Sequence, residues 1–235
     1  MPEQARDRAW FLRGAASLAL AGSPLTRTAA AFASTPALTP DEALVRLLAG
    51  NGRFVASRLT GGNGITARRA SVAPRQAPFA IVLTCSDSRL GPEYIFDQRL
   101  GDIFVCRVAG NILDPAILGS IEYAYEHFHC PAVVVLGHQR CGAVTDTVEL
   151  VQKNARAPED IQRIVEAITP AVTATKRGSL SQADYVDAVV KTNAKMIATG
   201  LARHSAALEA AVLTGKLRVA PAYYSLDSGK VKILA

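Results

Sequence analysis

The sequence predicts an α/β fold, a single domain in which helices flank a central, mostly parallel β-sheet with an antiparallel C-terminal edge strand. Three observations predict it. Short uninterrupted apolar runs at 79–84, 102–108 and 132–136 are typical of strands that are covered on both faces. Helical patterns separate these runs, and strands that alternate with helices form parallel sheets with right-handed crossovers. A final apolar run is followed by a turn, which adds the antiparallel edge.

Capping and turn residues set the expected bounds of the other elements. Thr39, Pro40 and Glu42 predict the start of a helix that ends near Gly50. The stretch 61–69 is expected to be a surface connection. Further helices are expected from Asp114 to 128, from Cys141 to about 151, from 158 to an interruption at Pro170, from Ser181 to about 200, and over 201–213. The last strands are expected at 216–220 and 231–234, joined by a turn at Asp227–Lys230.

Composition and charge narrow the class of protein. The chain of 235 residues is 49% hydrophobic and 20% charged, which is typical of a globular domain with a sizeable core. It carries 26 Lys and Arg against 20 Asp and Glu, a net charge of +6, but these charges are scattered along the chain. No stretch reaches the roughly 18 to 20 apolar residues of a membrane-spanning helix. Neither nucleic acid nor a membrane is therefore expected as a partner.

The first 33 residues have the layout of a cleavable export signal. A mild apolar run precedes Ala31-Phe32-Ala33, a small-residue cleavage site, and basic residues lie at Arg6, Arg8 and Arg13. The beginning resembles a twin-arginine signal whose arginine pair is broken by Ala9. We therefore expect residues 1–33 to be a signal and the protein to be exported to a bacterial periplasm. The alternative is a cytoplasmic protein with an N-terminal arm.

Metal-binding side chains follow two of the predicted strands. Cys85 comes directly after the first strand, and His138 and Cys141 follow the third. Because the carboxyl ends of parallel strands meet at one edge of a sheet, these residues are expected to lie close together. Two thiolates and an imidazole suit tetrahedral Zn²⁺ and leave a fourth position for water or substrate. Cys141 also lies where a helix is expected to begin, and the positive end of a helix favours a thiolate.

An acid and an arginine lie just after Cys85. By themselves, Asp87 and Arg89 indicate only a salt bridge that stiffens a loop. Beside a metal, Asp87 could fill the fourth position, or it could turn onto Arg89 and leave that position to water. A carboxylate held by arginine stays ionised and can accept a hydrogen bond from water on the metal. We therefore predict a zinc site with an acidic gate.

The remaining cysteines, Cys106 and Cys130, lie in apolar surroundings and are expected to be small buried side chains. An even number of cysteines in an exported protein also leaves open two disulfides. The histidines outside the predicted site, His127, His129 and His204, are candidates for proton transfer, although a place at the surface or at a helix end is the expectation for each.

The motifs resemble those of the β-class carbonic anhydrases. The resemblance covers about residues 39–235, so the catalytic domain is expected at 34–235, and it rests on Cys85-Ser86-Asp87-Ser88-Arg89, Gly137-His138 and Cys141-Gly142. It implies that Cys85, His138 and Cys141 bind one zinc ion per chain and that Asp87 and Arg89 form a gating dyad. The implied activity is that of a carbonate dehydratase, a lyase that reversibly hydrates CO₂ to bicarbonate and a proton through a zinc-bound hydroxide. The implied assembly is a homodimer or homotetramer.

Two alternatives keep the same site and change its use. One is a hydrolase of the same fold that acts on carbonyl sulfide or carbon disulfide, because the same nucleophile attacks those molecules. The other is a non-catalytic zinc- or anion-binding module, in which Asp87 permanently closes the fourth position.

Overall fold

The computed structural model describes residues 38–235, so the predicted signal lies outside the described residues. The predicted α/β architecture is confirmed. The sheet has five strands in the order β2-β1-β3-β4-β5. The first four strands run parallel, and β5 pairs antiparallel with β4 at the edge. The strands are β1 (Ala80–Thr84), β2 (Ile103–Arg107), β3 (Ala132–His138), β4 (Arg218–Tyr224) and β5 (Val231–Ile233).

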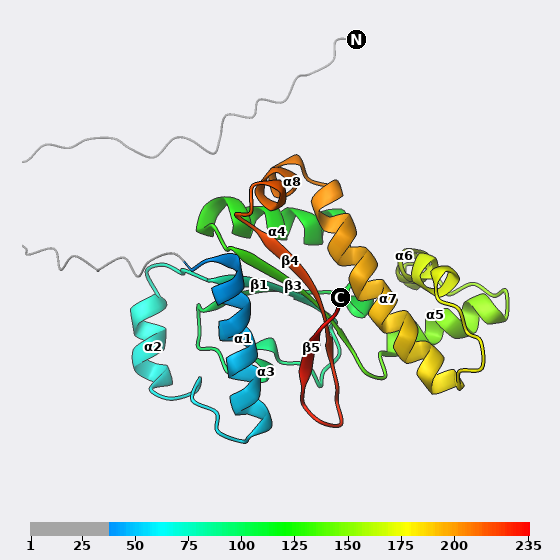
Figure 1. Cartoon of the computed structure of the whole chain (residues 1–235), viewed down its shortest axis with the longest axis horizontal. Helices are drawn as coiled ribbons and strands as arrows, with labels where there is room; N and C mark the ends of the chain where they lie inside the picture. The colour runs from blue at the N-terminus through cyan, green and yellow to red at the C-terminus, as the bar shows by residue number, and fades with distance from the viewer. Residues whose placement is uncertain (1–37) are drawn as a thin grey trace, which may run out of the picture. The chain divides into compact units, whose positions relative to one another are not determined.

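Helices cover both faces of this sheet (Figure 1). Along β1 and β3, Val82 and Val134 pack with α1 and α3, whereas Ile81 and Val133 pack with α4, α7 and α8. Both faces are therefore apolar, which explains the uninterrupted apolar runs in the sequence. The helices are α1 (Pro40–Val55), α2 (Ile65–Val72), α3 (Pro92–Ile95), α4 (Pro115–Phe128), α5 (Gly142–Gln152), α6 (Ile161–Ala174), α7 (Gln182–Arg203) and α8 (Ala206–Leu213), with a 3-10 turn, η2, at Ala109–Asn111.

Three caps lie where the sequence places them. Thr39 and Glu42 form the predicted capping box at the start of α1. Asp114 accepts from two backbone N–H groups at the start of α4, and Ser181 caps α7. These bonds satisfy N–H groups that have no partner within the helix, so the sequence locates these helix starts to the residue.

Three predictions within the helices were wrong. The first helix does not end near Gly50, because α1 continues to Val55. The stretch expected to be a surface connection contains α2, a short helix with no buried residue and no side-chain cap, so apolar periodicity could not reveal it. Pro170 does not interrupt α6, which continues to Ala174. Ile168, Ala171 and Val172 are buried on either side of the proline, and their packing outweighs the lost backbone hydrogen bond.

Two predictions near the C-terminus also need correction. The segment expected as one helix at 201–213 is the end of α7 followed by α8, because Ser205 accepts from Leu208 N and begins a new helix. The strand expected at 216–220 is β4, which passes through Pro221. Proline has no backbone N–H group to donate to a neighbouring strand, and it is tolerated here because β5 pairs only with residues 222–224. The carbonyl oxygen of Pro221 still accepts a hydrogen bond from Leu234 N at 2.8 Å.

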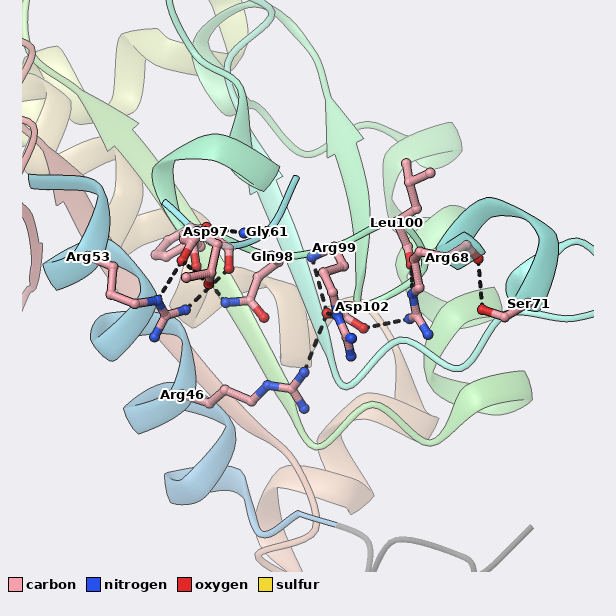
Figure 2. A network of polar contacts seen from close by, with 12 residues as sticks. Arg46, Arg53, Gly61, Arg68, Ser71, Asp97, Gln98, Arg99, Leu100 and Asp102 are labelled. Carbon is pink, nitrogen blue, oxygen red and sulfur yellow. Dashed lines mark hydrogen bonds and ion pairs between the residues drawn. The ribbon is translucent and has the colours of Figure 1, made fainter. Parts of the chain in front are cut away.

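Two buried carboxylates, Asp97 and Asp102, fasten α1 and α2 to the rest of the domain (Figure 2). Asp102 binds Arg68 of α2 at 2.7 Å and lies 3.5 Å from Arg46 of α1. Asp97 pairs with Arg53 of α1 and accepts from the backbone N–H groups of Thr60 and Gly61. Ion pairs thus replace apolar burial in holding the α2 segment.

Substitution of Asp97 should reveal this contribution as a pH-dependent loss of stability. Burial raises the pKa of Asp97, but hydrogen bonds from Arg53, Gly61 and Thr60 outweigh it and lower the pKa to about 2. Because the pKa is lower in the folded state, the carboxylate stabilises the fold above about pH 4 and ceases to do so as the pH falls to about 2. We expect Asp97→Asn to cost about 2 kcal/mol at pH 7.

The measurement is the free energy of unfolding of the wild type and of Asp97→Asn between pH 2 and 7. The difference should be largest above pH 4 and shrink below it. Asp160→Asn, at a fully exposed Asp–Arg pair, is the matched control and should change little. A difference that stays constant over the whole pH range would contradict the account.

Within residues 38–235, the structure contains no helix with the length and apolar character needed to cross a membrane.

Candidate metal centre

The structure brings together the three side chains that the sequence nominates as metal ligands. Cys85 follows β1, His138 is the last residue of β3, and Cys141 is the N-cap residue of α5. Their ligand atoms all lie within 4.8 Å of one another, and all three residues are buried. Among residues 38–235, no other group of three or more His, Cys, Asp or Glu side chains converges in this way.

The imidazole of His138 is oriented for metal binding. Its Nδ1 lies 3.0 Å from Gln139 O, and a ring nitrogen beside a carbonyl oxygen carries the proton and donates it. The Nε2 atom then has a free lone pair. It is also buried without a hydrogen-bond partner, one of two such side-chain atoms among the described residues. An orphaned buried nitrogen is costly unless a further group binds it, and a metal ion would do so.

The two sulfur atoms also fit zinc. Cys85 Sγ and Cys141 Sγ are 3.9 Å apart. Two zinc–sulfur bonds of about 2.3 Å span this separation at an angle close to tetrahedral. The donor set of two thiolates and one imidazole, together with these positions, fits a zinc ion with one coordination position open.

The surroundings of the two thiols favour, in one of them, the ionised form that binds a cation. Hydrogen bonds to Cys85 Sγ from the Cys141 thiol and from Gly110 N lower the pKa of Cys85 well below its usual value. The Cys85 thiolate accepts from the Cys141 thiol and so raises the pKa of Cys141. Without a metal, only one of the two sulfurs ionises, because a second thiolate at this distance would repel the first. A bound dication removes that conflict and stabilises both thiolates.

Asp87 and Arg89 lie beside this centre as a bidentate pair. Arg89 Nε donates to Asp87 Oδ1 at 2.9 Å, and Arg89 Nη2 donates to Oδ2 at 2.7 Å. Arg89 holds the pKa of Asp87 well below its usual value, so the carboxylate stays ionised. Asp87 Oδ2 is also 3.9 Å from His138 Nε2, which places an ionised acceptor at the edge of the metal centre.

Arg107 is a contributor that the sequence reasoning missed. Its Nε donates to Cys85 O at 3.1 Å, and its Nη2 donates to Asp87 O at 2.8 Å. One guanidinium therefore fixes the backbone of the loop that carries both a ligand and the gate. The register between β1 and β2 could have identified it. Arg107, at the carboxyl end of β2, pairs with Thr84 and therefore lies next to Cys85.

The turn between β4 and β5 supports the second ligand loop. Asp227 binds Arg140 Nη2 at 2.6 Å and Gln139 Nε2 at 2.8 Å. Arg140 O in turn accepts from Arg89 Nη2 at 3.3 Å. The gate arginine and the backbone between His138 and Cys141 are thus connected by direct hydrogen bonds.

The other cysteines and histidines lie outside this arrangement. Cys106 and Cys130 are buried free thiols, as the sequence predicts, and burial raises their pKa values to about 11 and 12. His127 lies in the last turn of α4, and His129 and His204 are the C-cap residues of α4 and α7. These places agree with the expected helix-end positions.

Fold and site together define a class: an α/β metalloprotein whose buried thiolate–imidazole centre lies at the carboxyl ends of parallel strands, with an arginine-held carboxylate beside it. Comparison with known proteins narrows this class. A model of the carbonic anhydrase family matches residues 80–231.

Named relatives extend the match over most of the chain. Carbonic anhydrase 2 of Mycobacterium tuberculosis is 37% identical over 197 residues, which are 83% of this chain and 93% of the relative. A carbonic anhydrase of Mycolicibacterium smegmatis is 38% identical over 201 residues, 84% of this chain and 95% of the relative.

Solved structures agree. The β-carbonic anhydrase of Coccomyxa, in complex with acetazolamide, superposes with a TM-score of 0.66 at 26% identity and covers 81% of this chain and 86% of its own. The β-carbonic anhydrase CafA of Aspergillus fumigatus gives a TM-score of 0.65 at 26% identity and covers 81% and 90%. The chain belongs to the β-class carbonic anhydrases, a family of zinc enzymes, as its motifs predict.

Proposed function

We propose that this chain is a zinc-dependent carbonate dehydratase that reversibly hydrates CO₂ to bicarbonate and a proton. The observation that carries the proposal is the buried group of Cys85, His138 and Cys141 with an ionised carboxylate beside it. Zinc at such a centre supplies a nucleophile at neutral pH, because it lowers the pKa of a bound water to about 7.

In this proposal each ligand has a defined structural role. Cys85 Sγ, His138 Nε2 and Cys141 Sγ hold the ion, and the hydrogen bond between His138 Nδ1 and Gln139 O keeps the imidazole neutral with Nε2 free. The N-terminal end of α5 adds positive potential at Cys141, which favours its thiolate form.

Asp87 acts on the reacting water. A carboxylate whose pKa is held low stays ionised and only accepts hydrogen bonds, so Asp87 Oδ2 can accept a hydrogen bond from an O–H group and orient that oxygen toward CO₂. The two hydrogen bonds from Arg89 fix the orientation of the Asp87 carboxylate for this purpose. The pair therefore selects the attacking water and its geometry.

An apolar cluster encloses the two cysteines. Residues that pack with Cys85 and Cys141 include Ile112, Val144 and Val190 from three different segments. Such surroundings exclude bulk water and strengthen the interactions of Asp87 with Arg89 and with the reacting oxygen. An apolar environment also suits CO₂, which carries no charge.

The observed pairing favours an open centre over a permanently closed one. Both oxygens of Asp87 accept from Arg89, so the carboxylate is engaged away from the metal position. This arrangement supports catalysis rather than a non-catalytic zinc- or anion-binding module.

A stopped-flow assay tests the proposed substrate. The purified zinc-loaded protein should hydrate CO₂ far faster than it hydrolyses carbonyl sulfide or carbon disulfide, each offered separately at the same enzyme concentration. A protein that turns over only the sulfur compounds would support the hydrolase alternative. A zinc-loaded protein inert toward all of them would contradict the proposal.

The protein is also proposed to self-associate as a homodimer or homotetramer. Four apolar side chains that are at least two-fifths exposed surround a hollow of about 340 Å³ beside α2 and α3: Leu59, Ile65, Tyr94 and Leu100. A second copy would cover this surface. Light scattering of the zinc-loaded protein should give a multiple of the chain mass, and a monomer at micromolar concentration would contradict the proposal.

Export to the periplasm is proposed on the layout of residues 1–33 alone. Mass spectrometry of the native N-terminus in fractionated cells tests it. A chain that begins at Ser34 in the periplasm supports cleavage, whereas an intact start at Met1 or Pro2 in the cytoplasm contradicts it.

A further inference from the structure

Gly110 of η2 lies directly against one of the proposed zinc ligands. Its backbone N–H donates to Cys85 Sγ at 3.3 Å, and the bond is buried. A hydrogen bond from an N–H group to a thiolate draws electron density from the sulfur and orients its lone pairs. The position of this N–H therefore affects how Cys85 binds the metal.

The backbone at Gly110 depends on contacts from outside the loop. Gly110 has a φ of +70°, a left-handed conformation that favours glycine, and a Cβ atom at this position would also approach Ile168 Cδ1 to 2.6 Å. Glycine restrains the backbone less than any other residue. The orientation of its peptide groups is therefore set by whatever holds them from outside.

Asn193 of α7 provides such a contact. Its Nδ2 donates to Gly110 O at 2.9 Å in a buried hydrogen bond, and Asn193 is 2% exposed. Among residues 38–235, it is the only side chain that donates to a carbonyl of the 108–111 loop.

The surroundings of Asn193 make this contact notable. Its neighbours on α7, Val189, Val190 and Ala194, are buried apolar residues. An amide on a buried apolar face costs stability unless it is hydrogen-bonded, so a packing role alone would be filled better by an apolar side chain.

We infer that Asn193 is a positioning residue of the metal centre, which acts through the Gly110 carbonyl to hold the Gly110 N–H on Cys85 Sγ. The inference rests on the proposed role of Cys85 as a zinc ligand. It predicts that Asn193 controls the electron density on the Cys85 sulfur as well as the packing of α7.

Cobalt substitution and zinc affinity test this inference in the full-length protein. Cobalt bound by thiolates shows a sulfur-to-metal charge-transfer band whose energy falls as the sulfur becomes richer in electrons. In Asn193→Ala, we expect this band to move to lower energy, because Cys85 loses a well-placed hydrogen bond. We also expect the zinc dissociation constant, measured by chelator competition, to rise about tenfold.

Two further variants separate positioning from stability. Leu201→Ala shortens another buried residue of α7, eight positions later and outside the apolar cluster around Cys85 and Cys141, and should lower the melting temperature without moving the charge-transfer band. Asn193→Leu keeps the branched shape of the side chain, with a larger volume, but removes the amide. It should shift the band as Asn193→Ala does, and it provides the test if the alanine variant does not fold.

The inference is wrong if a folded Asn193 variant keeps both the wild-type band and the wild-type zinc affinity, even when its melting temperature falls as in Leu201→Ala. Failure of the proposed function looks different. A wild-type protein that binds zinc and shows the cobalt band but does not hydrate CO₂ contradicts the function and leaves the role of Asn193 intact.

Discussion

Cys85→Ser is expected to lose both the zinc ion and the CO₂ hydration activity. Cys85 supplies one of only three protein ligands, and the serine hydroxyl is neutral at pH 7, whereas the hydrogen bonds around Cys85 lower the pKa of its thiol and favour the thiolate. We expect the zinc content of the purified variant to fall from about one per chain to near zero, and the activity to fall to the uncatalysed background. Elemental analysis and stopped-flow hydration measure the two quantities.

Cys106→Ser is the matched control for this experiment. Cys106 is also a buried cysteine, but it lies outside the metal centre, and burial raises its pKa rather than lowering it. This variant should lose some stability and keep its zinc. A Cys85→Ser protein that retains full zinc and full activity would show that the ion binds elsewhere.

Asp87→Asn is expected to keep the zinc ion and lose most of the activity. The amide carries no charge, it cannot bind Arg89 through two charged hydrogen bonds, and one of its two polar atoms donates instead of accepting. Positioned groups that accept a proton or orient a reacting water typically contribute a factor of about 100 to 10,000 in rate. We therefore expect kcat/KM for CO₂ to fall at least about 100-fold.

The control for Asp87→Asn is Asp160→Asn, which removes a carboxylate from an exposed Asp–Arg pair on the surface. Its activity should match that of the wild type. If Asp87→Asn also retains wild-type activity with zinc bound, then Asp87 and Arg89 form only a structural loop salt bridge, and the gating role is wrong.

The sequence predicts the proximity of the metal ligands because few folds are compatible with its apolar runs. Once β1 and β3 are identified as buried parallel strands, Cys85 and His138 must emerge at the same edge of the sheet. Cys141 follows three residues later, at a helix start that the loss of the strand pattern already indicates.

The missed features depend on contacts that no local pattern records. Arg107 reaches the Cys85 loop only because of the register between β1 and β2, and Asn193 meets Gly110 across 83 positions of sequence. The α2 helix lacks a buried face and is held by Arg68 on Asp102. The order of the strands, which places β1 between β2 and β3, likewise required the structure.

The measurement that tests the central claim most directly is a zinc titration of the metal-free protein, followed by CO₂ hydration at constant pH. We predict that the metal-free wild type is inactive, that its activity rises in proportion to added zinc and stops rising at about one ion per chain, and that Cys85→Ser stays inactive throughout. Full activity before zinc is added, or activity restored by zinc in Cys85→Ser, would contradict the claim that Cys85, His138 and Cys141 form the catalytic zinc site.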